Sequence, residues 1–167
     1  MLKKNLDVAI IQFDCPPDKD EAIARIEYLV DDAAVGADLV LLAETPFTPY
    51  TTVSDFRPLA EPVPGPYSDR LGRLAQRHGI YLCSGTVEED GDDVYNTALL
   101  FSPGGELLHK HRKCTLASCD ASGGFKAGKS IDVVETPFGR VGILICLDTI
   151  ERANQQIMAE LRPDLIL

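Results

Sequence analysis

Apolar and polar residues over the first forty or so positions follow the pattern of a strand, a helix and a second strand. Residues 6–13 (LDVAIIQF) form a short, nearly continuous apolar run, which is typical of a strand buried on both faces. Asp18 is placed to cap a helix in which apolar residues recur at helical spacing until Gly36. Residues 37–42 (ADLVLL) form another apolar run, so this segment predicts a β-α-β crossover unit.

The middle of the chain predicts a loop, a helix and several hairpins. Six prolines between positions 46 and 66 indicate a long loop, and a loop of this length in a compact domain is usually functional. An apolar stripe at helical spacing predicts a helix over residues 67–78, ended by Gly79. Turn residues separate short apolar runs and predict hairpins at 89–92, 102–105 and 136–139.

The last part of the chain predicts a loop, a helix and a final strand. Residues 111–130 contain few apolar side chains and many Gly, Ser and Lys residues, so we expect a loop there. A helix is expected from about Glu151 to Leu161, and residues 164–167 (DLIL) begin another strand. Crossover units combined with hairpins predict one α/β domain with a mixed sheet.

Composition and charge narrow the class of protein and of partner. The 167 residues are 45% hydrophobic and 25% charged, as in ordinary globular domains. Sixteen Lys and Arg against 26 Asp and Glu give a net charge of −10, which disfavours nucleic-acid binding. No apolar run reaches the roughly 18 residues of a membrane span, and the N-terminus lacks a signal-peptide pattern. Five cysteines without an export signal favour a reduced, cytoplasmic setting.

Cys146 stands where chemistry is expected. It follows the apolar run of GRVGILIC and precedes the predicted helix, and ligand sites in open α/β sheets gather at the carboxyl ends of strands. A helix N-terminus stabilises a nearby thiolate, which would make Cys146 a nucleophile. A buried structural cysteine is the alternative, because free Cys packs as a small hydrophobic residue.

Glu44 and Lys113 also stand just after strand-like runs. A carboxylate that follows five apolar strand residues is costly if it points inward without partners, and the alternative is a solvated loop residue. The basic neighbours of Lys113 leave open that it belongs to a solvated cluster. Glu44, Lys113 and Cys146 thus follow one another along the chain in the order Glu, Lys, Cys, with separations of 69 and 33 residues.

The flanks of these residues resemble the nitrilase, or carbon–nitrogen hydrolase, superfamily. The matching stretches are AIIQFD, LVLLAETPFTPY, VYNTALLFSPGGELLHKHRKCTL and ETPFGRVGILICLD, which together cover essentially the whole chain. The resemblance implies an α/β fold, a four-layer αββα sandwich with mixed β-sheets. Because the family domain normally continues further, it also implies that residues 1–167 form a single carbon–nitrogen hydrolase domain lacking its C-terminal portion.

The resemblance also implies a Glu-Lys-Cys triad and a reaction. Cys146 would attack the carbon of an amide, carbamoyl or nitrile group, and Glu44 would take the thiol proton and later activate water. Lys113 would stabilise the thiolate and the oxyanion, with the backbone N–H of Leu147 as a second donor. The implied products are an acid and ammonia or an amine, formed through a thioester. The implied partners are a small-molecule substrate and further copies of the chain, as a homodimer or larger oligomer, and no metal or organic cofactor is needed.

Four further residues are candidates for substrate binding: Tyr50, Asn96, Leu147 and Asp148. Asp148 matches an aspartate that follows the family's nucleophile, but Leu147 stands where many members have an aromatic residue. A loop aromatic that packs on the domain is the alternative for Tyr50, and a hydrogen bond to a neighbouring turn is the alternative for Asn96.

The chain departs from the family pattern between the lysine and the cysteine. Family members often have a second glutamate there, and measured back from Gly128 its position falls at Ala121, with Asp120 beside it. The support that such a carboxylate would give to Lys113 or the substrate is therefore in doubt. Cys114 and Cys119 lack a matching second pair elsewhere in the chain, so a zinc site is not expected.

Two other interpretations of the chain stay open. It could be a catalytically silent family member or fragment that serves as a binding or assembly module. It could also be a flavodoxin-like regulatory domain, which predicts a helix between all successive strands. The predicted hairpins argue against this last interpretation.

Overall fold

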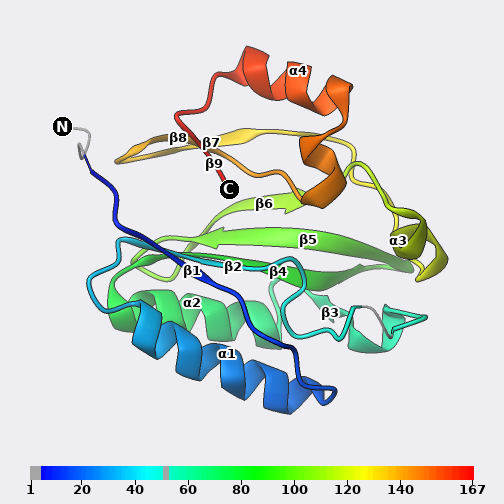
Figure 1. The fold of residues 1–167 in the computed structure, drawn as a ribbon, viewed down its shortest axis with the longest axis horizontal. Coiled ribbons are helices and arrows are strands. Elements are labelled where there is room, and N and C mark those ends of the chain that lie inside the picture. Colours follow the sequence, from blue (N-terminus) through cyan, green and yellow to red (C-terminus); the bar gives the residue numbers. More distant parts are fainter. Residues whose placement is uncertain (1–4, 51–52) are drawn as a thin grey trace.

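The computed structural model describes residues 5–50 and 53–167 and arranges them in four layers (Figure 1). Helices α1 (Lys19–Ala33) and α2 (Pro66–His78) cover one face of the larger sheet, and the smaller sheet lies against its other face. Helix α4 (Arg152–Leu161) covers the outside of the smaller sheet. This is the αββα sandwich implied by the resemblance. Within the described residues, no helix combines the length and hydropathy required to cross a membrane.

The larger sheet is mixed, and its strands follow the order β1-β2-β4-β5-β6, with β3 paired to β4. Strands β1, β2 and β4 are parallel, and β4, β5 and β6 are antiparallel hairpin partners. The strands are β1 (Val8–Ile11), β2 (Leu39–Leu42), β3 (Glu61–Pro62), β4 (Tyr81–Asp90), β5 (Asp93–Phe101) and β6 (Leu107–Arg112). The carboxyl ends of β2 and β6 therefore carry the segments that lead to Glu44 and Lys113.

The structure confirms two of the capping residues predicted for α1 and α2. The Asp18 side chain accepts the Glu21 N–H at 2.9 Å and caps α1. Gly79 ends α2 in the left-handed conformation, with φ 63°. The apolar stripe of α2 is buried against the sheet through Leu71 and Leu74.

The smaller sheet combines the antiparallel pair β7 (Val133–Thr136) and β8 (Gly139–Gly142) with β9 (Leu165–Ile166), which is parallel to β8. Apolar side chains from both sheets form the core between them, among them Leu39, Leu100 and Ile143. The 3₁₀ helix η2 (Cys146–Thr149) lies between β8 and β9 in the chain. The nucleophile candidate Cys146 begins η2 and lines a cavity with residues of the larger sheet, such as Leu41 and Ala98.

The predicted loop over 111–130 is wrong in part. Strand β6 continues to Arg112, and a short helix α3 (Ser118–Ser122) forms within the segment. The sequence does not show the end of β6 as an apolar run because a buried side chain there, His111, is polar. The proline-rich loop also contains β3 and the 3₁₀ helix η1 (Arg57–Leu59). Of the apolar run that leads to Cys146, only the part up to Gly142 forms a strand.

Candidate active site

Lys113 is the centre of a buried charge cluster at the end of β6. Its side chain is only 1% exposed, and its Nζ lies 2.7 Å from Glu44 Oε1 and 2.8 Å from Asp120 Oδ2. An ammonium group in the protein interior is costly unless it is paired, and here it has two carboxylate partners. The structure thus brings together Glu44 and Lys113, which stand 69 residues apart in the sequence.

The backbone after β2 turns sharply and directs Glu44 toward this cluster. Thr45 adopts a positive φ of 39°, and the turn lies so close to β4 that a Cβ on Gly85 would be 2.3 Å from Thr45 N. The Asn96 Nδ2 group on β5 donates to Glu44 Oε1 at 2.6 Å, the same oxygen that Lys113 contacts. Both bonds to Glu44 therefore involve one carboxylate oxygen and hold the side chain in one orientation.

Asp120 is the residue of this cluster that the sequence left unassigned. It is fully buried in α3, and its carboxylate accepts the Ala117 N–H at 2.7 Å and a hydrogen bond from the Tyr50 hydroxyl. Burial raises the pKa of the Asp120 carboxyl and the charge of Glu44 raises it further, whereas the Ala117 N–H favours the charged form. The signal in the sequence was an aspartate one position from the expected glutamate, and only the fold shows that it reaches Lys113.

Cys146 begins η2 in a left-handed backbone conformation, with φ 48°, and its side chain is exposed. The 3₁₀ helix η2 has only four residues including Cys146, and α4 begins at Arg152, so the expected α-helix N-terminus beside the thiol is wrong. Within the described part of the chain, no hydrogen bond joins the thiol to Glu44 or Lys113.

Cys146 and Glu44 line the same cavity, which has a volume of about 190 Å³. Its other walls come mainly from apolar groups on both sheets, such as Leu41, Ala98 and Ile143. The cavity is therefore a space in which a small molecule would touch the thiol and the carboxylate together.

Two of the other cysteines are poorly suited to nucleophilic chemistry. Burial raises the pKa of Cys83 to about 12. Burial also raises the pKa of Cys114 to about 11, with a further contribution from the charges of Asp148 and Asp132. Both thiols are protonated at neutral pH, and the thiolate is the reactive form, so Cys114 is a weak rival to Cys146.

The four residues suggested for substrate binding occupy different environments. Asn96 and Asp148 are fully buried, and the Tyr50 hydroxyl is engaged by Asp120. Leu147 is half-buried in η2, next to the nucleophile candidate. These placements favour positioning roles for Tyr50, Asn96 and Asp148 over direct contact with a substrate.

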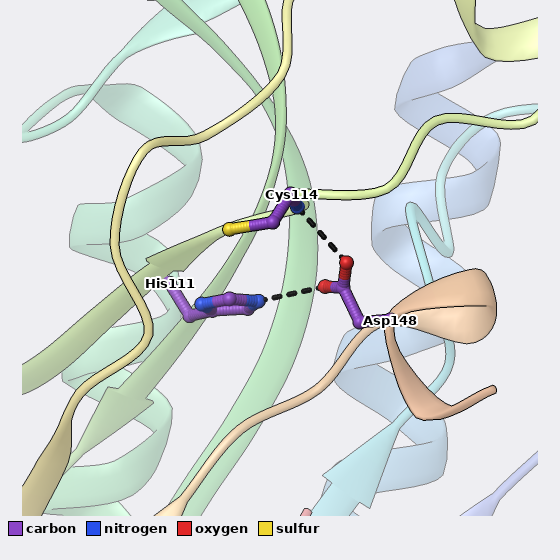
Figure 2. A group of neighbouring side chains, drawn as sticks. All are labelled: His111, Cys114 and Asp148. Carbon is purple, nitrogen blue, oxygen red and sulfur yellow. Dashed lines mark hydrogen bonds and ion pairs between the residues drawn. The ribbon is translucent and has the colours of Figure 1, made fainter. Parts of the chain in front are cut away.

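One group of side chains has the composition of a metal site. The ligand atoms of His111, Cys114 and Asp148 lie within 4.8 Å of one another (Figure 2). The Asp148 oxygens, however, already accept hydrogen bonds from His111 Nε2 at 2.8 Å and from the Cys114 N–H at 3.0 Å. The Cys114 thiol is directed to the carbonyl oxygens of Arg112 and Ser130. These contacts fit a closed hydrogen-bond network better than a cation site.

The amino-acid sequence is similar to a known enzyme family over nearly its whole length. Residues 7–166 match the carbon–nitrogen hydrolase family. Omega-amidase NIT2 from Xenopus tropicalis is 39% identical over 151 residues, which are 84% of this chain and 54% of that protein. Omega-amidase NIT2 from Homo sapiens is 34% identical over 163 residues, 92% of this chain and 59% of that protein. The chain thus spans somewhat more than half the length of these curated relatives.

Solved structures agree with the fold. A carbon–nitrogen hydrolase from Helicobacter pylori G27 matches 96% of this chain and 58% of its own, with a TM-score of 0.87 and 20% identity. An N-terminal amidase matches 86% of this chain and 40% of its own, with a TM-score of 0.74 and 20% identity. The match over residues 7–166 establishes the family, and the chain belongs to the carbon–nitrogen hydrolases.

Proposed function

We propose that the protein hydrolyses a carbon–nitrogen bond of a small molecule, such as an amide, through a thioester on Cys146. One observation carries the proposal. The buried Lys113 ammonium is paired with Glu44, and Glu44 shares a cavity with the exposed Cys146 thiol. A carboxylate base, a cation and a sulfur nucleophile are the groups that acyl transfer requires. The omega-amidase and N-terminal amidase relatives support this class of substrate.

In the first half-reaction, Glu44 takes the thiol proton and the Cys146 sulfur bonds to the carbonyl carbon. Since the bonds from Lys113 and Asn96 both fall on Oε1, we assign Oε2 to the proton. The negative oxygen of the tetrahedral intermediate is stabilised by the Lys113 ammonium and the Leu147 N–H. Glu44 then gives the proton to the leaving nitrogen as the carbon–nitrogen bond breaks.

In the second half-reaction, Glu44 takes a proton from water, whose oxygen attacks the thioester carbon. The carbon–sulfur bond breaks, the sulfur regains the proton, and the acid leaves. Asp120 supports this sequence by pairing with the Lys113 ammonium, and the Tyr50 hydroxyl donates to Asp120. A nitrile or carbamoyl substrate, a cytoplasmic location and assembly into a homodimer or larger oligomer remain predictions.

The proposal is tested by chemical labelling together with turnover. Iodoacetamide at pH 7 should alkylate Cys146 about tenfold faster than Cys119, which is also exposed but lies in α3. Glu44→Gln should remove that advantage and lower ammonia release from a panel of small amides by about 10²-fold or more. Cys146→Ala should abolish turnover, whereas the matched control Cys119→Ala should retain it.

Equal labelling of Cys146 and Cys119 in the wild-type protein, with no turnover on any amide, would contradict the proposal. That result would favour the alternative, in which a silent family member serves as a binding or assembly module.

A further inference from the structure

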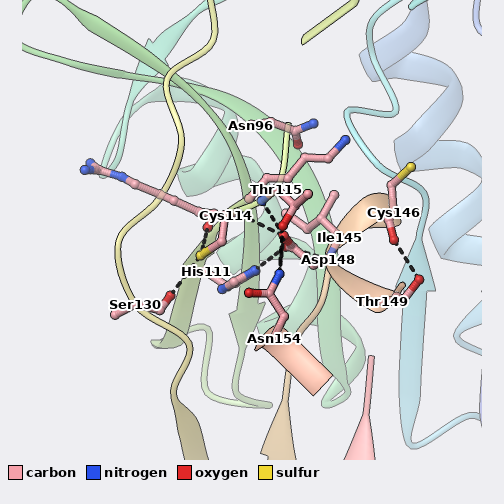
Figure 3. A network of polar contacts seen from close by, with 12 residues as sticks. Asn96, His111, Cys114, Thr115, Ser130, Ile145, Cys146, Asp148, Thr149 and Asn154 are labelled. Atoms are coloured by element: carbon pink, nitrogen blue, oxygen red, sulfur yellow. Dashed lines mark hydrogen bonds and ion pairs between the residues drawn. The ribbon is translucent and has the colours of Figure 1, made fainter. Parts of the chain in front are cut away.

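Asp148 is a fully buried carboxylate at the junction of three segments (Figure 3). Five groups donate to its two oxygens: His111 Nε2, the N–H groups of Cys114, Thr115 and Ile145, and Asn154 Nδ2. A buried carboxylate is stable only with such partners, and the number here is unusually high for one side chain. Figure 3 shows these bonds converging on Asp148, while the Cys146 side chain stands apart from them.

One oxygen of Asp148 holds the backbone that follows the lysine. Its Oδ1 accepts the Cys114 N–H at 3.0 Å and the Thr115 N–H at 2.7 Å. These are the two residues directly after Lys113. The direction in which the chain leaves Lys113 is therefore set by Asp148.

The other oxygen holds the backbone that precedes the nucleophile. Its Oδ2 accepts the Ile145 N–H at 3.2 Å, and Ile145 is the residue directly before Cys146. The same oxygen lies 2.8 Å from Nε2 of His111, on the last part of β6. One side chain thus joins the strand that carries the lysine to the turn that carries the cysteine.

The network favours the charged form of this carboxyl. Burial alone would raise the pKa of Asp148, but hydrogen bonds from His111 and from the N–H groups of Thr115 and Ile145 outweigh it and lower the pKa. Hydrogen bonds to an ionised acceptor are stronger than those between neutral groups, so the junction is held firmly.

We propose that Asp148 is a positioning residue that fixes the distance between the Lys113 ammonium and the Cys146 sulfur. The inference rests on the proposed function of these two residues. Lys113 directly follows β6 of the larger sheet, whereas Cys146 lies in η2, beyond β8 of the smaller sheet. The two residues are 33 positions apart in the sequence, so a noncovalent tie must hold them in register. A displacement of about 1 Å in such a site can cost about 10²-fold in rate.

Asp148→Asn tests the inference because it preserves shape but presents an amide N–H₂ to at least one donor of the network. We expect Cys146 to react with iodoacetamide about tenfold more slowly at pH 7. Cys119 in the same molecule serves as the internal reference and should not change.

A double-mutant cycle separates positioning from general damage. If Asp148 acts through the lysine, Asp148→Asn should have little further effect on Cys146 labelling in a Lys113→Met background. A folded Asp148→Asn protein that labels like the wild type would overturn the inference, and so would an undiminished effect in the Lys113→Met background.

A milder variant, Asn154→Ala, tests the positioning role of Asp148 if Asp148→Asn does not fold. Asn154 donates to Asp148 Oδ1 at 3.3 Å and to Thr115 Oγ1 at 2.9 Å, so Asn154→Ala removes one donor and leaves four. We expect a two- to threefold slower reaction of Cys146, on the order of one weak hydrogen bond. Gln156→Ala is the matched control, because the exposed Gln156 side chain is on the same helix and donates to Glu160 within that helix. Equal rates for the two variants would overturn the inference.

The two proposals fail in different ways. If the wild-type Cys146 reacts no faster than Cys119, the proposed function fails. If the wild-type Cys146 is activated but the Asp148 and Asn154 variants keep that activation, only the positioning role fails.

Discussion

Cys146 combines an exposed thiol with a backbone conformation that residues other than glycine rarely adopt. Its φ of 48° lies in the left-handed region, and its carbonyl accepts the Thr149 hydroxyl at 2.7 Å, which closes the turn. Left-handed residues with a Cβ cost on the order of 1 kcal/mol or more, and such residues cluster at functional sites. The strain is consistent with a position kept for its sulfur.

This strain predicts an inverted order of stability for two substitutions. Cys146→Gly should be more stable than Cys146→Ala by about 1 kcal/mol, because glycine adopts positive φ without steric cost. Urea denaturation measures the difference. In the helical position Cys119 the order should reverse, with Cys119→Gly less stable than Cys119→Ala by about 0.5–1 kcal/mol. A Cys146→Gly protein no more stable than the alanine variant would contradict the argument.

The position of Glu44 depends on how the turn after β2 packs against β4. The Glu44–Thr45 turn passes directly over β4 at Gly85, and the Gly85 N–H donates to the Ala43 carbonyl at 3.3 Å. Only a residue without a Cβ allows this approach, because the nearest atoms belong to the backbone of the turn. A glycine in the middle of a strand was thus a sign of close backbone contact.

Gly85→Ala should therefore displace Glu44. An added Cβ would lie 2.3 Å from Thr45 N and 2.9 Å from Ala43 O, so the turn must move. We expect a loss of stability of about 1–3 kcal/mol and a fall in amide turnover of about 10²-fold. Gly104→Ala is the control, because its added Cβ would meet only the Ser102 Oγ, at 3.4 Å. The argument fails if the two alanine variants behave alike.

Sequence patterns predicted the elements well where burial is apolar and poorly where it is polar. The apolar runs that became β1 and β2 and the capped helix α1 matched the expected positions within a few residues. The expected burial of β1 on both faces is wrong, because Val8 and Ile10 are exposed. The end of β6 was assigned to a loop because His111, though buried, is polar. Such residues are buried only because distant partners satisfy them, and a local pattern does not contain those partners.

At the scale of the whole molecule, buried carboxylates tie together strands and segments that are far apart in the sequence. Glu88 is almost fully buried and accepts hydrogen bonds from Thr97, Lys110 and Arg112. Burial alone would raise the pKa of Glu88, but the bonds from Arg112 and Lys110 outweigh it and lower the pKa. Asp148 behaves in the same way. Carboxyls with lowered pKa values stabilise the fold only while they are ionised.

This predicts a loss of stability in acid. The contribution of Glu88 is complete above the unfolded-state pKa of about 4.3 and is lost as the pH falls through the lower pKa of the folded state. The melting temperature should therefore fall below about pH 4, and Glu88→Gln should lower it at pH 7 and flatten its pH dependence. Glu135→Gln is the control, because that side chain is 77% exposed. Parallel melting curves for the Glu88 variant and the wild type across this range would contradict the prediction.

The sequence by itself determined the order of most elements, the α/β class and the family, and it supplied Glu44, Lys113 and Cys146 as candidate site residues. Periodicity and capping depend on neighbours a few positions away, and they can be found along the chain. Only the tertiary structure decided that Asp120 supports the lysine, that no helix N-terminus adjoins the cysteine, and that Asp148 joins the two sheets. These facts depend on contacts between residues far apart in the chain, where a shift of one position, as from Ala121 to Asp120, changes which side chain reaches the site.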